Sequence, residues 1–142
     1  MTFPDVNIFV YAAYKNSVNH GQYNRWVDEL INGSEPFAVS EIILSSVVRL
    51  ITNKKIFDSP FTIQEALTFA GNIRKAPQVR LIVPGVKHWD IFEKLCLELN
   101  PKSGSVTDAY LAALAIEHDC ELVSADRGFS RYPDLRWKHL SF

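Results

Sequence analysis

The sequence has few of the features that mark specialised classes of protein. Only two of its 142 residues are cysteine, Cys96 and Cys120, and they form no CxxC pair or other metal-type spacing. Both have apolar neighbours, so we expect reduced, buried thiols, as in a cytoplasmic protein. No apolar run approaches the ~18 residues of a membrane span. The N-terminal stretch MTFPDVNIFVYAAYKN has no basic leader and contains Asp5, which argues against a secretory signal.

An excess of charge of one sign is also missing. The chain has 15 basic and 16 acidic side chains, which gives a net charge of -1. Binding of nucleic acid over a whole surface depends on excess positive charge, so the composition argues against that mode. It leaves open an enzyme with a local basic rim around an acidic centre. The four histidines are scattered and have no paired ligand, which argues against a zinc site.

The chain contains short β-leaning runs that alternate with longer stretches of helical period. Strands are predicted at the N-terminus and at 37–40, 79–83, 120–124 and 135–140. Helices are predicted at 20–33, 41–53, 62–75, 87–100 and 107–116. Such alternation is typical of a parallel sheet with helices on both faces. We therefore predict an α/β fold: one three-layer α/β/α domain over residues 1–142, with about four or five parallel strands.

Local signals predict several element boundaries. Ser40 is placed to cap the helix that follows it. The stretch TIQE at 62–65 has the form of a capping box. The stretch PKSGS at 101–105 is expected to be a flexible loop, after which Thr107 caps the next helix. The helix at 87–100 is expected to pack through one apolar face, which contains Trp89, Phe92, Leu95, Cys96 and Leu99.

Four carboxylates fall near the ends of predicted strands. Asp5 follows the first strand, Glu41 the second and Asp126 the fourth, and Asp108 begins the helix that leads into the fourth strand. In a parallel sheet these positions share one edge. Each carboxylate alone is explained as a helix cap or a first-turn charge. Four together would repel one another unless a cation lies among them, and oxygen-only ligands suit Mg²⁺ or Mn²⁺.

These motifs together resemble one known family. DVN at 5–7, the acid that begins the helix after the second strand, TDAYLAALAIEH at 107–118 and LVSADRGF at 122–129 are similar to the PIN-domain ribonucleases. The likeness is strongest to the VapC-type toxins of bacterial toxin–antitoxin pairs, and it covers nearly the whole chain. It implies a metal-dependent endoribonuclease that cuts structured RNA such as tRNA, with a small cognate antitoxin as partner. Whether apolar surface serves a homodimer or the antitoxin stays open.

The resemblance also implies roles for individual residues. It assigns the catalytic acids to Asp5, Glu41, Asp108 and Asp126, with Asn7 and Ser124 as nearby polar positions. Asp5 and Asp108 are expected to be the primary metal ligands. Asp126 is expected to bind the metal directly or through water, and Glu41 to complete the shell or position the attacking water.

Three further positions bear on this expected site. Arg127 and Arg131 are candidates for phosphate contacts, although solvated surface charge explains them equally well. Gly128 stands where many relatives carry another aspartate. The resemblance therefore leaves open whether one metal ion binds or two.

Two other interpretations of an acidic α/β chain fit the sequence less well. A receiver-like regulatory module typically has adjacent acids after the first strand and an aspartate after the third. Here the third strand ends in LIVPGV, and Asp5 has no acidic neighbour. A phosphatase with an aspartyl nucleophile usually has a second aspartate two positions on, where this chain has Asn7.

Overall fold

The computed structural model describes residues 1–142 as five strands and six α-helices. The strands are β1 (Thr2–Pro4), β2 (Phe37–Val39), β3 (Val79–Leu81), β4 (Glu121–Ser124) and β5 (Trp137–His139). The helices are α1 (Val6–Ala13), α2 (His20–Asn32), α3 (Glu41–Ile51), α4 (Ile63–Arg74), α5 (His88–Leu99) and α6 (Val106–Glu117). Two 3₁₀ helices complete the structure, η1 (Ser103–Ser105) and η2 (Arg127–Arg131). None of the helices has both the length and the apolar character that crossing a membrane requires.

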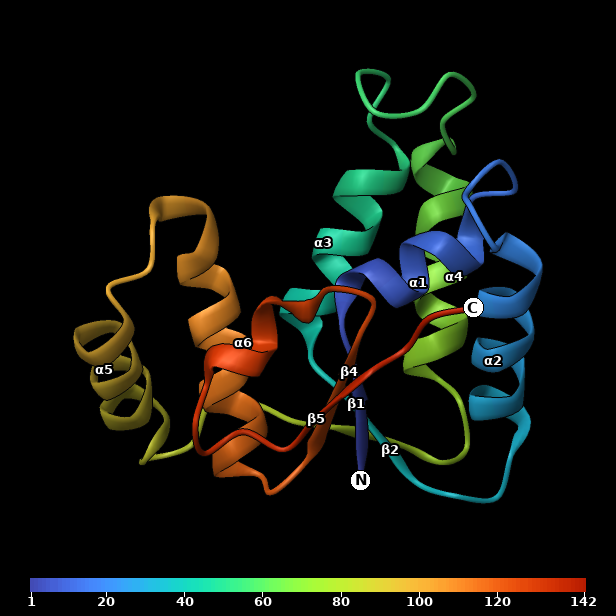
Figure 1. Ribbon diagram of the computed structural model, residues 1–142. Coiled ribbons are helices and arrows are strands. Elements are labelled where there is room, and N and C mark those ends of the chain that lie inside the picture. Colours follow the sequence, from blue (N-terminus) through green and yellow to red (C-terminus); the bar gives the residue numbers. More distant parts are fainter.

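The strands form one sheet in the order β3-β2-β1-β4-β5, and every neighbouring pair is parallel. Helices α1 to α4 lie on one side of the sheet, and α5 and α6 lie on the other (Figure 1). Right-handed crossovers require this division, because the chain moves from β1 toward one edge and then returns to add β4 on the other side. The predicted three-layer α/β/α fold is therefore confirmed. A receiver-like order, 2-1-3-4-5, is not the one observed.

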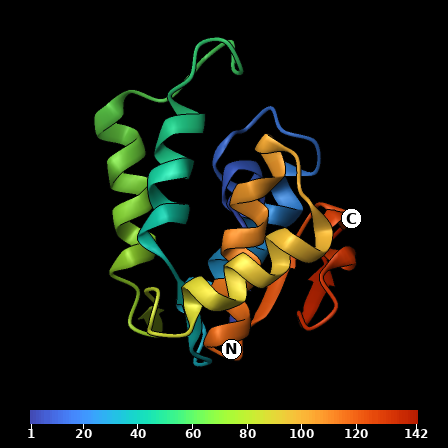
Figure 2. The same cartoon turned by 90° about the vertical axis from the view of Figure 1, so that its left-hand side faces the viewer.

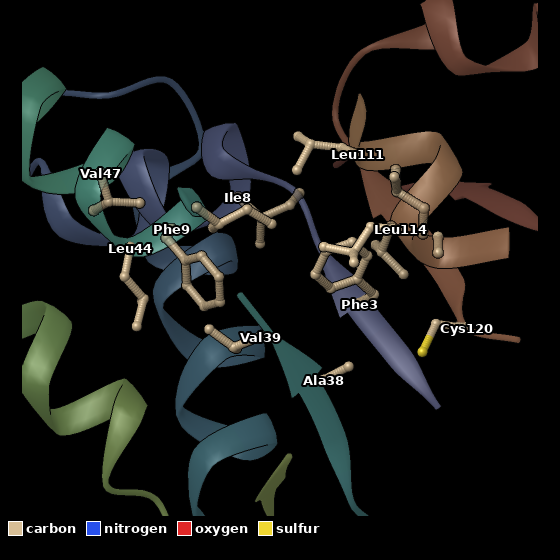
Figure 3. Packing of buried hydrophobic residues seen from close by; sticks show 14 of the residues in the cluster. Phe3, Ile8, Phe9, Ala38, Val39, Leu44, Val47, Leu111, Leu114 and Cys120 are labelled. Carbon is tan, nitrogen blue, oxygen red and sulfur yellow. The ribbon is translucent and has the colours of Figure 1, made fainter. Parts of the chain in front are cut away.

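The core fills both spaces between the sheet and its helices. Figure 3 shows Ile8, Phe9, Val39, Leu44 and Val47 packed together on the side of α1 and α3. Side chains on a strand alternate between faces, so other residues of the sheet are directed to the opposite layer. There Phe3 packs with Leu111 and Leu114 of α6 (Figure 3). This packing fixes α1 and α6 against the central strand from opposite sides.

Strand β1 is short, and its end is held next to β4. Proline has no backbone N–H to donate, which limits the ladder at Pro4. Pro4 lies opposite Val123 of β4, and the backbone N–H of Asp5 donates to the carbonyl of Val123 at 2.8 Å. The first residue after β1 is thereby fixed beside the carboxyl end of β4.

Helix starts agree only in part with the sequence. The capping box at α4 is confirmed: Thr62 Oγ1 accepts from Glu65 N, and Glu65 accepts from Thr62 N. Ser40 occupies the N-cap position of α3, but its hydroxyl is buried and makes no hydrogen bond, so the predicted side-chain cap is wrong. The expected cap at Thr107 is also wrong, because η1 leads directly into α6 and the N-cap is Ser105. Thr107 is consequently a residue within the helix.

The expected apolar face of α5 is shifted. Trp89 is 62% exposed, whereas its neighbour His88 is buried and its ring Nε2 lies 3.1 Å from the carbonyl oxygen of Tyr110. Only Leu95 of the predicted face is fully buried. The prediction failed for Trp89 because hydrophobicity alone does not show that a histidine with a backbone partner takes the inner position. Strands β3 and β5, at three residues each, are also shorter than predicted.

Candidate functional site

A cavity of about 490 Å³ opens beyond the carboxyl ends of β1 and β4. Binding sites in open parallel sheets are found at this edge. The cavity lies between helices of both layers, because α1, α3 and α6 all contribute side chains to it. Its lining consists of Asp5, Val6, Asn7, Val10, Tyr11, Ser46, Arg49, Leu50, Ile56, Phe57, Gly104, Thr107, Asp108, Leu111 and Asp126. Three of the four predicted acidic residues therefore share one pocket.

Asp5 is the most buried of these carboxylates, with 7% of its surface exposed. It is the N-cap of α1, and its Oδ1 accepts a hydrogen bond from Val6 N at 2.7 Å. Its Oδ2 accepts from the hydroxyl of Ser124 at 2.8 Å. Burial raises the pKa of Asp5; the bonds from Ser124 and Val6 oppose that rise, and the charge of Asp126 adds to it. The side chain is therefore fixed in position, but its negative charge is not neutralised by any cation of the chain.

Ser124 is the centre of a hydrogen-bond network that joins β1, α1 and β4. It is fully buried, and its Oγ accepts from Asn7 Nδ2 at 3.1 Å and from Asp126 N at 3.0 Å while it donates to Asp5. Asn7 Oδ1 also accepts from Ala125 N at 3.2 Å. These bonds fix the turn that follows β4 relative to Asp5. Of the two polar positions predicted from the sequence, Ser124 bonds directly to Asp5 and to the backbone of Asp126, and Asn7 bonds to Ser124 and Ala125.

Asp108 faces the other two aspartates from the first turn of α6. Its pKa is raised from 3.8 to about 6, first by burial and then by the charges of Asp5 and Asp126, while Arg131 acts in the opposite direction. Three carboxylates from three separate elements therefore repel one another across this pocket. A bound cation would remove that repulsion.

Asp126 lies at the exposed rim as the N-cap of η2, where its Oδ1 accepts from Gly128 N at 2.9 Å. A Cβ at Gly128 would meet the Asp126 carboxylate at 3.4 Å, an ordinary contact, and the φ of Gly128 is not positive. The backbone does not require glycine at this position. The turn would therefore accept a residue with a side chain at position 128, and its geometry does not explain why a further carboxylate is missing here.

Glu41 does not join the other three acids. Its carboxylate pairs with the Nε of Arg74 at 3.0 Å, with 66% of the Glu41 side chain exposed, and it lies outside the pocket. Helices α3 and α4 lie side by side (Figure 2). The ion pair with Arg74 places the Glu41 carboxylate on the α4 side of α3. The expected convergence of four carboxylates is thus met by three.

Two polar residues of α3 that sequence reasoning did not place in the site line it instead. Ser46 follows Glu41 by five positions, which places it roughly 140° away around the helix axis, and Arg49 lies one turn beyond Ser46. No signal in the sequence singled out this pair, because Glu41 and Ser45 are also polar residues of α3. Thr107, one residue before Asp108, also lines the pocket, and it lies within the first turn of α6 rather than at the N-cap.

The two arginines predicted to meet phosphates lie on η2, next to the pocket. Arg131 is close enough to lower the pKa of Asp108, and its guanidinium lies 5.5 Å from the centre of the Tyr132 ring. Arg127 is exposed and directly follows Asp126. Neither side chain lines the cavity itself. The structure therefore positions both as rim residues.

The chemistry of the pocket fits a hard divalent cation. Its charged donors are oxygen atoms of Asp5, Asp108 and Asp126, and no cysteine or histidine lies among the lining residues. No group of three or more His, Cys, Asp or Glu side chains is arranged to hold a metal ion by itself. Mg²⁺ keeps several waters and is usually held by one or two carboxylates, so a closed protein cage is not required. The raised pKa values of Asp5 and Asp108 are consistent with a site that favours positive charge.

Comparisons with known proteins agree with the fold and the motifs. The family model for the PIN domain matches residues 2–135. Ribonuclease VapC43 of Mycobacterium tuberculosis is 34% identical over 135 residues, which cover 95% of this chain and 92% of the relative. Ribonuclease VapC25 of the same organism is 34% identical over 132 residues, 93% of each chain.

Solved structures resemble the fold over nearly the full length. A VapBC2 complex from Rickettsia felis, bound to a promoter DNA fragment, matches with a TM-score of 0.70 and 19% identity, over 99% of this chain and 98% of the other. VapC20 of Mycobacterium tuberculosis, a Sarcin–Ricin loop cleaving toxin, matches with a TM-score of 0.63 and 16% identity, over 94% and 95%. Together with the family model and the curated relatives, these matches show that the chain belongs to the PIN-domain family, among the VapC-type ribonucleases.

Proposed function

We propose that this chain is an endoribonuclease that hydrolyses RNA phosphodiester bonds in the cytoplasm with a divalent cation, Mg²⁺ or Mn²⁺. The observation that carries the proposal is the meeting of Asp5, Asp108 and Asp126 in one pocket, where none of the three carboxylates forms an ion pair. The family match gives no support to the receiver or phosphatase interpretations.

Asp5 and Asp108 are the proposed primary metal ligands, and Asp126 completes the set directly or through water. When bound, the metal supplies the positive charge that makes a water nucleophilic and stabilises the leaving oxygen. Ser124 and Asn7 hold Asp5 and the turn at Asp126 in fixed positions, which limits the reorganisation needed on binding. No side chain is needed as a covalent nucleophile.

Glu41 is proposed to position the attacking water. In its present conformation it pairs with Arg74, so this role requires the ion pair to open. An exposed pair of this kind is stabilised by no more than about 1 kcal/mol, which makes opening inexpensive. Arg127 and Arg131 on the rim are proposed to contact phosphates on either side of the cleaved bond.

The proposed partner is a small antitoxin, and the proposed biological role is that of the toxin in a toxin–antitoxin pair. The solved complexes with the same fold are named as VapBC and toxin–antitoxin assemblies. A guanidinium binds carboxylates in bidentate geometry, so an arginine of the antitoxin would occupy the space of the metal. The proposed target is a structured RNA such as a tRNA, cut in a loop where the bases are unstacked.

The test of the reaction is cleavage of total RNA by the purified protein with Mg²⁺ or with EDTA, repeated with Asp5→Ala. Attack by water leaves a 5′-phosphate and a 3′-hydroxyl, whereas attack by the 2′-hydroxyl of the RNA leaves a cyclic phosphate. We expect 5′-phosphate ends that form only with the metal and only with Asp5 present. Cyclic-phosphate ends formed equally well in EDTA would rule out the proposed chemistry.

The toxin role needs a separate test. Expression of the chain alone should slow the growth of its host, and expression of the Asp5→Ala variant at the same level should not. A short reading frame beside the gene should encode the antidote, with an apolar segment and an arginine or lysine near its C-terminus. Equal toxicity of the two proteins would disprove the toxin role even if the metal site stood.

A further inference from the structure

The pocket has a second wall that the proposed hydrolysis does not use. It consists of apolar and aromatic side chains, Tyr11 of α1 together with Ile56 and Phe57 of the segment between α3 and α4. That segment forms the connection at the top of the molecule in Figure 1. An ion held by the carboxylates would fill only part of a cavity of about 490 Å³. The remaining space is lined by groups that suit an apolar or aromatic ligand.

These residues are not simply part of the core. Tyr11 is 36% exposed and Ile56 is 50% exposed, and both line the cavity. Phe57 is half-buried, and its ring packs against Tyr14 with centroids 4.0 Å apart. The ring of Tyr11 packs against the ring of Tyr23, with centroids 5.1 Å apart. The second wall is therefore a supported surface with ring and methyl groups open to the cavity.

A basic side chain also lines the pocket. Arg49 is the only basic residue that lines the cavity, and it takes part in no ion pair. Lys54 and Lys55 directly precede Ile56 and are exposed. A chain with a net charge of -1 thus has one cationic side chain in the pocket and two exposed ones in the segment that supplies Ile56 and Phe57. This combination is typical of single-stranded nucleic-acid binding, where basic groups contact the backbone and aromatic groups stack on bases.

We propose that the wall formed by Tyr11, Ile56 and Phe57 binds the base of an unpaired nucleotide next to the cleaved bond, and that Arg49 contacts its phosphate. The inference rests on the proposed ribonuclease function and adds to it the residues that hold the unstacked base at the cut. A base in a duplex is stacked on both faces and cannot enter such a pocket, so double-stranded RNA is excluded. Contact with a ring rather than with hydrogen-bonding groups makes the subsite tolerant of base identity.

The test separates recognition of the base from recognition of the backbone. All proteins carry Asp108→Asn so that RNA is not cut, and binding is measured at low salt to two probes of equal length. One is a mixed-sequence single-stranded RNA, and the other is a ribose-phosphate oligomer without bases. The test variants are Tyr11→Leu, Tyr11→Phe and Arg49→Gln. The matched controls are Ile63→Ala and Arg80→Gln, two exposed positions outside the pocket.

We expect Tyr11→Leu to weaken binding of the RNA about tenfold and to leave binding of the base-free oligomer unchanged. Tyr11→Phe keeps the ring and should bind both probes like the parent protein. Arg49→Gln should weaken binding of both probes to a similar degree. It should also reduce the dependence of the binding constant on salt concentration by about one phosphate contact. Neither control should weaken either probe.

The inference would be overturned if Tyr11→Leu bound the RNA as tightly as the parent protein, or if it weakened binding of both probes equally. Either result would indicate that the second wall contacts a protein partner instead. Cleavage assays in the background with Asp108 intact distinguish the two levels of failure. If cleavage still depends on Asp5 while Tyr11→Leu cuts like wild type, the base subsite is wrong and the ribonuclease function stands. If the wild type cuts no RNA, both proposals fall.

Discussion

The hydroxyl of Ser124 donates a hydrogen bond to Oδ2 of Asp5 at 2.8 Å, although 119 positions separate the two residues in the chain. The bond joins the ends of two adjacent parallel strands, β1 and β4. The same oxygen of Ser124 accepts hydrogen bonds from Asn7 and from the backbone of Asp126. One buried hydroxyl therefore sets the relative positions of two aspartates in the acidic pocket.

Removal of that hydroxyl should cost both stability and metal affinity. Ser124→Ala leaves a donor of Asn7 and the N–H of Asp126 without their acceptor, and a buried oxygen of Asp5 without its donor. We expect a loss of roughly 1–3 kcal/mol in the free energy of unfolding, measured by urea titration. Metal affinity, measured by titration of the folded protein, should fall roughly 10–100-fold. Ser45→Ala, which removes an exposed hydroxyl, is the control, and equal behaviour of the two variants would contradict the positioning role.

Divalent metal should stabilise the folded protein. A ligand that binds only the folded state raises stability by about 2.7 kcal/mol at a hundredfold excess over its Kd, which corresponds to several degrees in Tm. We expect Mn²⁺ or Mg²⁺ to raise Tm in the wild type and not in Asp108→Asn. Asp90→Asn, at an exposed position outside the pocket, should respond like the wild type. A Tm unchanged across millimolar Mn²⁺ would count heavily against the metal site.

The metal-free protein should lose stability as the pH rises through about 6. The pKa of Asp108 is raised from 3.8 to about 6 in the folded state, so its proton is bound more tightly there than in the unfolded chain. The resulting stabilisation is fully present below pH 3.8 and is lost as the pH rises through 6. In EDTA, Asp108→Asn should therefore gain in Tm relative to the wild type between pH 4 and pH 6.5. A constant difference over this range would show that Asp108 titrates normally.

Substitution of Glu41 should separate its role from that of the aspartates. Glu41 lies outside the pocket, so Glu41→Gln should keep the metal-induced rise in Tm and lose less than about 1 kcal/mol of stability. If Glu41→Gln lost RNA cleavage but kept the metal-induced rise in Tm, the result would support the proposed role of Glu41 in positioning water. Arg74→Gln breaks the same ion pair from the other side and is the matched variant. If Glu41→Gln abolished the metal response, Glu41 would have to be a ligand.

The sequence by itself determined the features that depend on neighbouring residues or on strand ends. The capping box of Thr62 and Glu65 needs only three residues of separation, so a local pattern predicts it, and it is confirmed. The alternation of strands and helices predicted a parallel sheet, and residues that follow parallel strands meet at one edge. For this reason the order of elements along the chain is enough to place Asp5 and Asp126 at the same edge, and the pairing of β1 with β4 then brings them into one pocket.

Only the tertiary structure decided which way each side chain faces. Glu41 and Ser46 lie on the same helix, and the packing of α3 against α4 and α1 determines that Ser46 faces the cavity while Glu41 meets Arg74. The second wall of the pocket was equally invisible, because Tyr11 and Ile56 are 45 positions apart and belong to separate elements. Rotation about a helix axis and contacts between distant segments come from the packing of the whole core. A local pattern of residue types is therefore not enough to predict which side chains of α3 face the cavity or which distant segments meet there.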